Sequence, residues 1–150
     1  MGFETTRGGT RGARSPRGAL LNFANRMTIK RIRKNSSSEM LVLTTVGRKS
    51  GAVRETPVRW FPGGEGSWLI VASANGAATN PAWYYNLAAA PDVTIDVQGR
   101  RVQVTATQLA GEERAAAWKQ ITAAAERFAG YQQKTDRELP ILRLAPRTAA

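Results

Sequence analysis

A basic, glycine-bounded turn is the first segment whose residue types could do chemistry. Residues 47–51 read Gly-Arg-Lys-Ser-Gly, and Arg54 follows shortly after. Glycines let a turn gather its backbone N–H groups, while cationic and hydroxyl side chains add charge and donors, so the segment predicts a phosphate site. It is not a P-loop, because the four-residue spacer before Gly-Lys-Ser is missing. A solvated hairpin turn is the alternative interpretation.

A run of small residues, 72–80 (ASANGAATN), is the second such segment. It lies between an expected buried strand and an expected helix, for which Asn80 is a suitable N-cap and Pro81 a suitable first residue. Small residues let a flat ligand approach the backbone, and a helix N-terminus favours an anion. A plain connecting loop is the alternative.

Aromatic side chains form the third group, and they would suit stacking on a ring system or packing in the core. They are Trp83, Tyr84, Tyr85, Phe128 and Tyr131. The chain has no cysteine and no histidine, which excludes disulfides, thiolate and imidazole chemistry and the common zinc sites. No metal site is expected, and an enzyme of this composition would rely on a cofactor for its chemistry.

Short strands must position these segments. Alternating or β-branched runs predict strands at 40–46, 53–61, 68–73, 93–97, 102–106 and 140–144, with Pro57 favouring an edge strand or a bulge. Helices are expected from 80 to before Pro91 and from Glu112 to about Phe128. The fold class is therefore mainly β with peripheral helices (α+β), as a closed or partly closed antiparallel barrel.

The net charge of +11 is concentrated at the N-terminus, where residues 1–34 hold nine basic side chains and one acidic one. Residues 1–17 are expected to be a disordered basic tail, residues 18–36 a basic amphipathic helix, and residues 37–147 the barrel domain. In the helix, Leu20, Phe23, Ala24, Met27 and Arg31 fall near one face, with Ile32 close by.

This helix has three interpretations: it packs on the domain, it binds an anionic membrane surface through residues 18–34, or it is a nucleic-acid arm. Nucleic acid is not expected, because the rest of the chain is near neutral. No segment has the apolar length of a membrane span or the pattern of a secretory signal. The expected location is cytoplasmic, with peripheral binding at the inner face of the cell membrane as an option.

In order and spacing, these segments resemble the deazaflavin-dependent nitroreductase family across residues 38–147. The matching stretches are 43–51 (LTTVGRKSG), 54–58 (RETPV), 71–73 (VAS), 80–87 (NPAWYYNL) with Pro91, 131–132 (YQ), 135–137 (TDR) and Pro140. The resemblance implies a split β-barrel that binds coenzyme F420, a 5-deazaflavin with an anionic phospholactyl-oligoglutamate tail.

By match of position, the resemblance also implies roles for particular residues. The cofactor's tail would be held by Arg48, Lys49, Ser50 and Arg54, and its ring lined by Pro57, Val58, Ala72, Ser73, Ala74 and Asn75, with support from Trp83 and Asn86. The substrate would lie near Arg59, Phe128 and Tyr131, and the hydroxyl of Ser73 or Tyr131 would act as a catalytic donor.

The chain departs from the family at three places. Members often carry Tyr at the positions of Arg59 and Phe128, and a Ser-Lys-Gly-Gly stretch where this chain has Ser73-Ala74-Asn75-Gly76. An arginine over the ring favours a more anionic or carbonyl-bearing acceptor.

The expected function is hydride transfer between F420 and an electron-poor quinone, activated alkene or nitro compound, by a monomer or homodimer. The alternatives are an FMN- or haem-type split-barrel protein and a ligand carrier without turnover.

Overall fold

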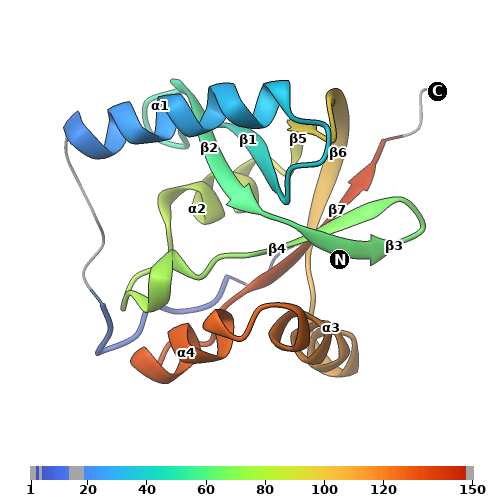
Figure 1. The fold of residues 1–150 in the computed structure, drawn as a ribbon. Helices are drawn as coiled ribbons and strands as arrows, with labels where there is room; N and C mark the ends of the chain where they lie inside the picture. Colours follow the sequence, from blue (N-terminus) through green and yellow to red (C-terminus); the bar gives the residue numbers. More distant parts are fainter. Residues whose placement is uncertain (1–2, 4, 14–18, 148–150) are drawn as a thin grey trace.

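The computed structural model of the protein describes residues 3, 5–13 and 19–147. Seven strands form one antiparallel sheet in the order β2-β1-β5-β6-β7-β4-β3 (Figure 1). They are β1 (Met40–Val46), β2 (Val53–Arg59), β3 (Phe61–Gly64), β4 (Ser67–Val71), β5 (Asp92–Val97), β6 (Arg100–Gln108) and β7 (Ile141–Pro146). The sheet curls, so that β2 approaches β4 without pairing with it. This confirms the expected antiparallel split barrel.

Apolar residues are buried on both faces of the sheet. Along β4, Trp68 and Ile70 join the cluster inside the barrel, while Leu69 and Val71 join the cluster on the outer face. This alternation follows from the two-residue period of a strand. Helix α2 (Ala82–Ala89) closes the interior with Tyr84 and Leu87, both fully buried.

The predicted N-terminal helix is present as α1 (Ala19–Lys34), but its packed face differs from the expected one. Ile29 and Ile32 pack on Val42 of β1, whereas Met27 is 42% exposed and Arg31 is exposed as well. Ile29 and Ile32 lie one helical turn apart, so they define the buried face of the described side chains of α1. The side chains of residues 19–24 lie outside the described part of the chain. Among the described residues, no helix is long and apolar enough to cross a bilayer.

The helix expected from Glu112 to Phe128 is two helices instead, α3 (Gly111–Ala124) and α4 (Arg127–Lys134). Ala125 leaves the helical region with φ −148° and ψ 91°. The break lets Phe128 pack edge-on against Phe61, with ring centroids 5.6 Å apart, in the cluster that also holds Ile121. The apolar residues from Glu112 to Phe128 follow one continuous helical period, so the sequence does not indicate this turn. The turn brings α4 beside the loop after β4.

Strand β3 was not expected as a separate element, since residues 62–66 read as a turn. The structure places β2 at one edge of the sheet, where β1 is its only partner among the described strands, which confirms the interpretation of Pro57. Pro57 removes one backbone donor, and an edge strand tolerates that loss.

Residues 3 and 5–13 differ from the expected disordered tail, because they lie along the barrel. We call residues 5–13 the N-terminal strap. The backbone N–H groups of Gly9 and Ala13 donate to the carbonyls of Ala78 and Gly76, at 2.6 and 3.0 Å. Gly12 allows this close approach, since a Cβ there would lie 2.4 Å from the nitrogen of Ala78. Residues 14–17 of the predicted tail lie outside the described residues.

Candidate functional site

Two neighbouring cavities meet at Trp83 and hold nearly all the predicted site residues. The loop cavity, of about 240 Å³, lies between β2, the loop after β4 and α4. It is lined by Met40, Pro57, Val58, Arg59, Val71, Ser73, Ala74, Asn75, Pro81, Trp83, Arg127, Phe128 and Tyr131. The turn cavity, of about 440 Å³, is lined by Gly47, Arg48, Lys49, Ser50, Arg54, Thr56, Ala82, Trp83 and Asn86.

The turn of residues 47–51 is held in place by its own backbone and by α2. The N–H of Gly51 donates to the carbonyl of Gly47 at 2.8 Å, and Gly51 takes the left-handed φ of 72° that suits glycine. The N–H of Arg48 donates to Oδ1 of buried Asn86 at 3.1 Å, and Nδ2 of Asn86 donates to Thr45 at 3.2 Å. Asn86 therefore fixes the turn to the barrel.

The cations of the turn cavity have no acidic partner among the described residues. None of the ion pairs between described residues includes Arg48, Lys49 or Arg54. The guanidinium of Arg48 lies 5.0 Å from the centre of the Tyr85 ring, which holds it beside α2. Three uncompensated cations around one cavity favour an anionic ligand with several charges.

The loop cavity has an unusual backbone along one wall. Ala74, Asn75 and Gly76 take successive positive φ values of 45°, 55° and 82°. Such conformations are unfavourable for alanine and persist only where the surroundings enforce them. Gly76 is required by space as well, since a Cβ there would lie 2.7 Å from the carbonyl oxygen of Tyr131. Ala72, which was expected to line the ring site, is fully buried behind this wall.

Arg59 reaches the loop cavity from β2, where its charge is partly compensated. Its Nη1 lies 2.9 Å from a carboxylate oxygen of Glu39, and its guanidinium stacks 4.7 Å from the centre of the Phe61 ring. The Arg59 side chain is 17% exposed and that of Glu39 is 72% exposed. The arginine is thus held in position by an exposed, solvent-screened partner.

Two hydroxyl groups in this cavity are available to a ligand. Within the described chain, neither the hydroxyl of Ser73 nor that of Tyr131 makes a hydrogen bond. The ring of Tyr131 packs edge-on against Phe128, with centroids 5.4 Å apart. Phe128 is itself only 5% exposed, so it contributes mainly to the core beneath the cavity.

Sequence reasoning missed Arg127 and the role of Asn80. Arg127 lines the loop cavity at the start of α4, a helix that the periodicity did not separate from α3. The predicted N-cap at Asn80 is wrong: α2 begins at Ala82, Pro81 is the N-cap, and no side chain caps it. The Asn80 side chain instead accepts a hydrogen bond from Arg137 and donates to Thr6 and Tyr85.

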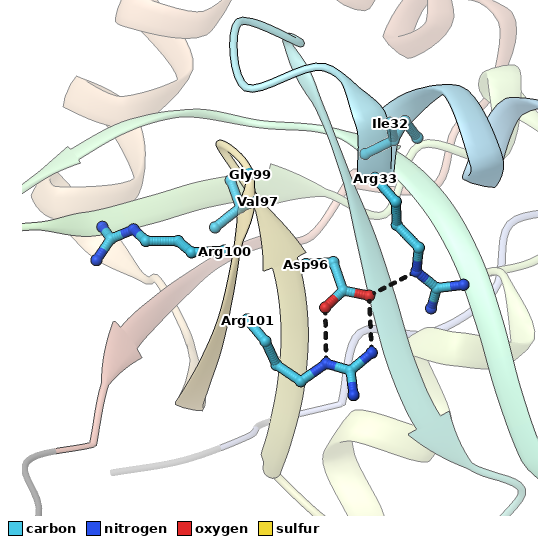
Figure 2. Close-up of a pocket in the computed structure, with 7 residues that line it drawn as sticks. All are labelled: Ile32, Arg33, Asp96, Val97, Gly99, Arg100 and Arg101. Atoms are coloured by element: carbon cyan, nitrogen blue, oxygen red, sulfur yellow. Dashed lines mark hydrogen bonds and ion pairs between the residues drawn. The ribbon is translucent and has the colours of Figure 1, made fainter.

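A separate cavity between α1 and the β5–β6 hairpin is lined by ion pairs that join these elements. Figure 2 shows Asp96 between the guanidinium groups of Arg33 and Arg101, both of which it pairs with at 2.8 Å. Burial raises the pKa of Asp96, yet the hydrogen bonds from Arg101 and Arg33 outweigh burial and leave that pKa below its ordinary value. Because Arg33 also pairs with Glu55, this cluster is largely self-compensated.

The split barrel places the loop cavity directly beside a cationic turn, an arrangement that suits a ligand with an anionic tail. The chain belongs to the F420H(2)-dependent quinone reductase family, whose sequence profile matches residues 22–146. An F420H(2)-dependent quinone reductase of Mycobacterium tuberculosis (strain H37Rv) is 37% identical over 110 residues, which cover 71% of this chain and 73% of that protein.

Solved structures agree with this assignment. The chain resembles an F420-H2 dependent reductase, FDR-A, with a TM-score of 0.64 and 36% identity over 71% of this chain and 93% of that one. It also resembles a chain described as a domain-swapped dimer, with a TM-score of 0.66 and 29% identity over 84% of this chain and 99% of the other. These findings confirm the resemblance drawn from the sequence.

Proposed function

We propose that this protein is an oxidoreductase that binds coenzyme F420 and reduces quinone-like acceptors. The observation that carries the proposal is the junction at Trp83 between the loop cavity and a turn cavity with three uncompensated cations. The names of the family and of its relatives support the same coenzyme and the same class of acceptor. The FMN alternative has no comparable support.

The residues present fit such a cofactor. Arg48, Lys49, Ser50 and Arg54 would bind the anionic tail, which is the chemistry their charges favour. The ring would lie against Pro57 and Val58 on one side and against the Ser73–Asn75 backbone on the other. Ala72 would support this wall from behind, and Trp83 and Asn86 would support it from α2.

When bound, the reduced coenzyme supplies two electrons and a proton to the acceptor as hydride. The chain's own residues then orient the acceptor and exclude water. Arg59, Phe128 and Tyr131 would contact the acceptor, and the unpaired hydroxyl of Ser73 or Tyr131 would donate to the oxygen that gains negative charge. This chemistry requires neither cysteine nor histidine, in agreement with their absence from the chain.

The proposal is tested by mixing the purified full chain with reduced F420 and a short-chain naphthoquinone, and following the return of oxidised F420 absorbance. Protein-dependent oxidation that saturates with quinone is expected. Binding of F420 without any turnover, across quinone, nitro and activated-alkene acceptors, would show a carrier instead of an enzyme.

We further propose that α1 brings the protein to anionic membrane surfaces, where lipophilic quinones are found. Its exposed side chains include Arg26, Lys30 and Arg31 beside the exposed Met27, a pattern typical of interfacial helices. Each basic residue near an anionic surface contributes about 1 kcal/mol to binding.

The test is co-sedimentation with vesicles that contain phosphatidylglycerol. The K30Q/R31Q variant is expected to sediment much less than the unaltered chain, and K119Q/K134Q is the control with the same charge change on α3 and α4. Equal loss in both variants would show only a general charge effect and end the membrane proposal.

A further inference from the structure

Arg137 is a buried cation behind the wall of the loop cavity. It is 1% exposed. Its guanidinium donates to the carbonyls of Ala77, Ala72 and Ser73 at 3.0, 2.9 and 2.8 Å, and to Oδ1 of Asn80 at 2.6 Å. All four acceptors belong to the segment 72–80, so a single side chain fixes the backbone of that segment from within.

In the part of the chain that the structure describes, no carboxylate pairs with this charge. None of the ion pairs within the described chain includes Arg137. The neighbouring Asp136 accepts hydrogen bonds from Thr10 and Arg11 of the N-terminal strap instead. Burial lowers the pKa of Arg137, but a guanidinium stays protonated in proteins, so the positive charge remains.

The hydrogen bonds of Arg137 also set the direction of two backbone donors. In a peptide group the C=O and the N–H point in opposite directions. Because the carbonyls of Ala72 and Ser73 point at Arg137, the N–H groups of Ser73 and Ala74 point away from it. Neither N–H has a hydrogen-bond acceptor within the described chain, and both residues line the loop cavity.

The backbone conformation gathers these donors. Ser73 has right-handed helical angles of φ −79° and ψ −35°, and Ala74 follows with φ 45°. A right-handed residue followed by a left-handed one forms a concavity of N–H groups that binds anions. The left-handed Ala74 is unfavourable by itself, and the bonds from Arg137 to the carbonyls on either side of Ser73 hold the chain in this form.

We propose that Arg137 is a positioning residue of the cofactor site, which holds the amides of Ser73 and Ala74 toward a bound deazaflavin and favours the negatively charged form of its ring. The inference rests on the proposed function. The ring's 8-hydroxyl is a weak acid, and the charge of the ionised form is delocalised over the fused rings. A buried cation without a counterion lowers the pKa of an acid nearby.

The test follows the absorbance of protein-bound oxidised F420 across pH, which reports ionisation of the chromophore. In the unaltered chain, the pKa of the bound chromophore is expected to lie below that of the free coenzyme. N80D places a carboxylate beside Arg137 in nearly the same volume, with loss of the hydrogen bond that Asn80 donates to Thr6, and is expected to raise the bound chromophore's pKa by about one unit. N35D adds the same charge outside both cavities and is expected to leave that pKa unchanged.

R137K separates the charge from its directed hydrogen bonds. A lysine keeps the charge but lacks the planar donors, so we expect faster amide hydrogen exchange across residues 72–77 and about tenfold weaker F420 binding. A folded N80D variant whose bound chromophore titrates as in the unaltered chain would overturn the inference. Failure of the unaltered chain to bind F420 would overturn the proposed function, and the inference with it.

Discussion

Arg59 gives the expected acceptor site a positive charge that the family resemblance does not imply. It lines the loop cavity, and its only ion-pair partner within the described chain is the exposed Glu39. Because Glu39 is largely exposed, solvent screens this ion pair, and the guanidinium can also bind a carbonyl or an anionic group of an acceptor.

R59A is therefore expected to raise the KM for the quinone roughly tenfold, the effect of losing one hydrogen bond to a charged group. The kcat should change less, because the hydrogen bond to the oxygen being reduced is assigned to Ser73 or Tyr131 and not to Arg59. E39Q is the matched variant: it removes the partner, keeps the arginine, and should leave KM equal or lower. Steady-state kinetics with a naphthoquinone measure both, and an unchanged KM in R59A would remove Arg59 from the acceptor site.

Residue types indicated which segments line cavities better than they indicated individual contacts. The basic turn and the small-residue loop were singled out from their residue types and their positions in the sequence, and both line cavities. The hydrogen bond between Arg137 and Asn80 was not predicted, because it joins positions 57 residues apart and depends on how the barrel closes.

Among the elements, the N-terminal strap has the clearest consequence for the cavity wall. It binds the backbone of Gly76 and Ala78 from outside, while Arg137 binds Ala77 from within. Low hydrophobicity and many glycines predict disorder, and the same glycines permit the close backbone contacts seen here. Composition cannot separate these cases, since the partner carbonyls come from a loop more than 60 residues away.

G12A is expected to detach the strap, because the new Cβ would meet the backbone of Ala77 and Ala78 at 2.6 and 2.4 Å. The unfolding free energy should fall by about 1 to 3 kcal/mol. G8A is the control within the same strap, since its Cβ would lie an ordinary 3.6 Å from the nearest atom, the carbonyl oxygen of Ala78. Chemical denaturation measures both, and equal stability of the two variants would contradict the strap contacts.

For the whole molecule, acidic side chains join segments that are distant in sequence. Asp136 accepts hydrogen bonds from the strap, and Asp96 joins α1 to β6 through Arg33 and Arg101. The side-chain hydrogen bond from Thr10 and the backbone N–H groups of Arg11 and Thr10 lower the pKa of Asp136 from 3.8 to about 2. A lowered carboxyl pKa stabilises the folded state at pH values above the ordinary pKa.

This contribution should be complete above about pH 4 and lost as the pH falls toward 2. The thermal midpoint of the unaltered chain should therefore exceed that of D136N at pH 5, and the difference should shrink as the pH approaches 2. Melting curves by circular dichroism across this range are the measurement. A difference that is constant with pH would show that Asp136 does not titrate with folding.

Binding of F420 is the central claim, and titration of the purified full chain with F420, with FMN in parallel, tests it most directly. Trp83 lies at the junction of the two cavities, so binding should quench tryptophan fluorescence. The predicted result is saturable quenching by F420 in the micromolar range, weakened in an R48Q/R54Q variant, with no saturable response to FMN. Saturable quenching by FMN alone would contradict the account and identify a flavin protein with the same fold.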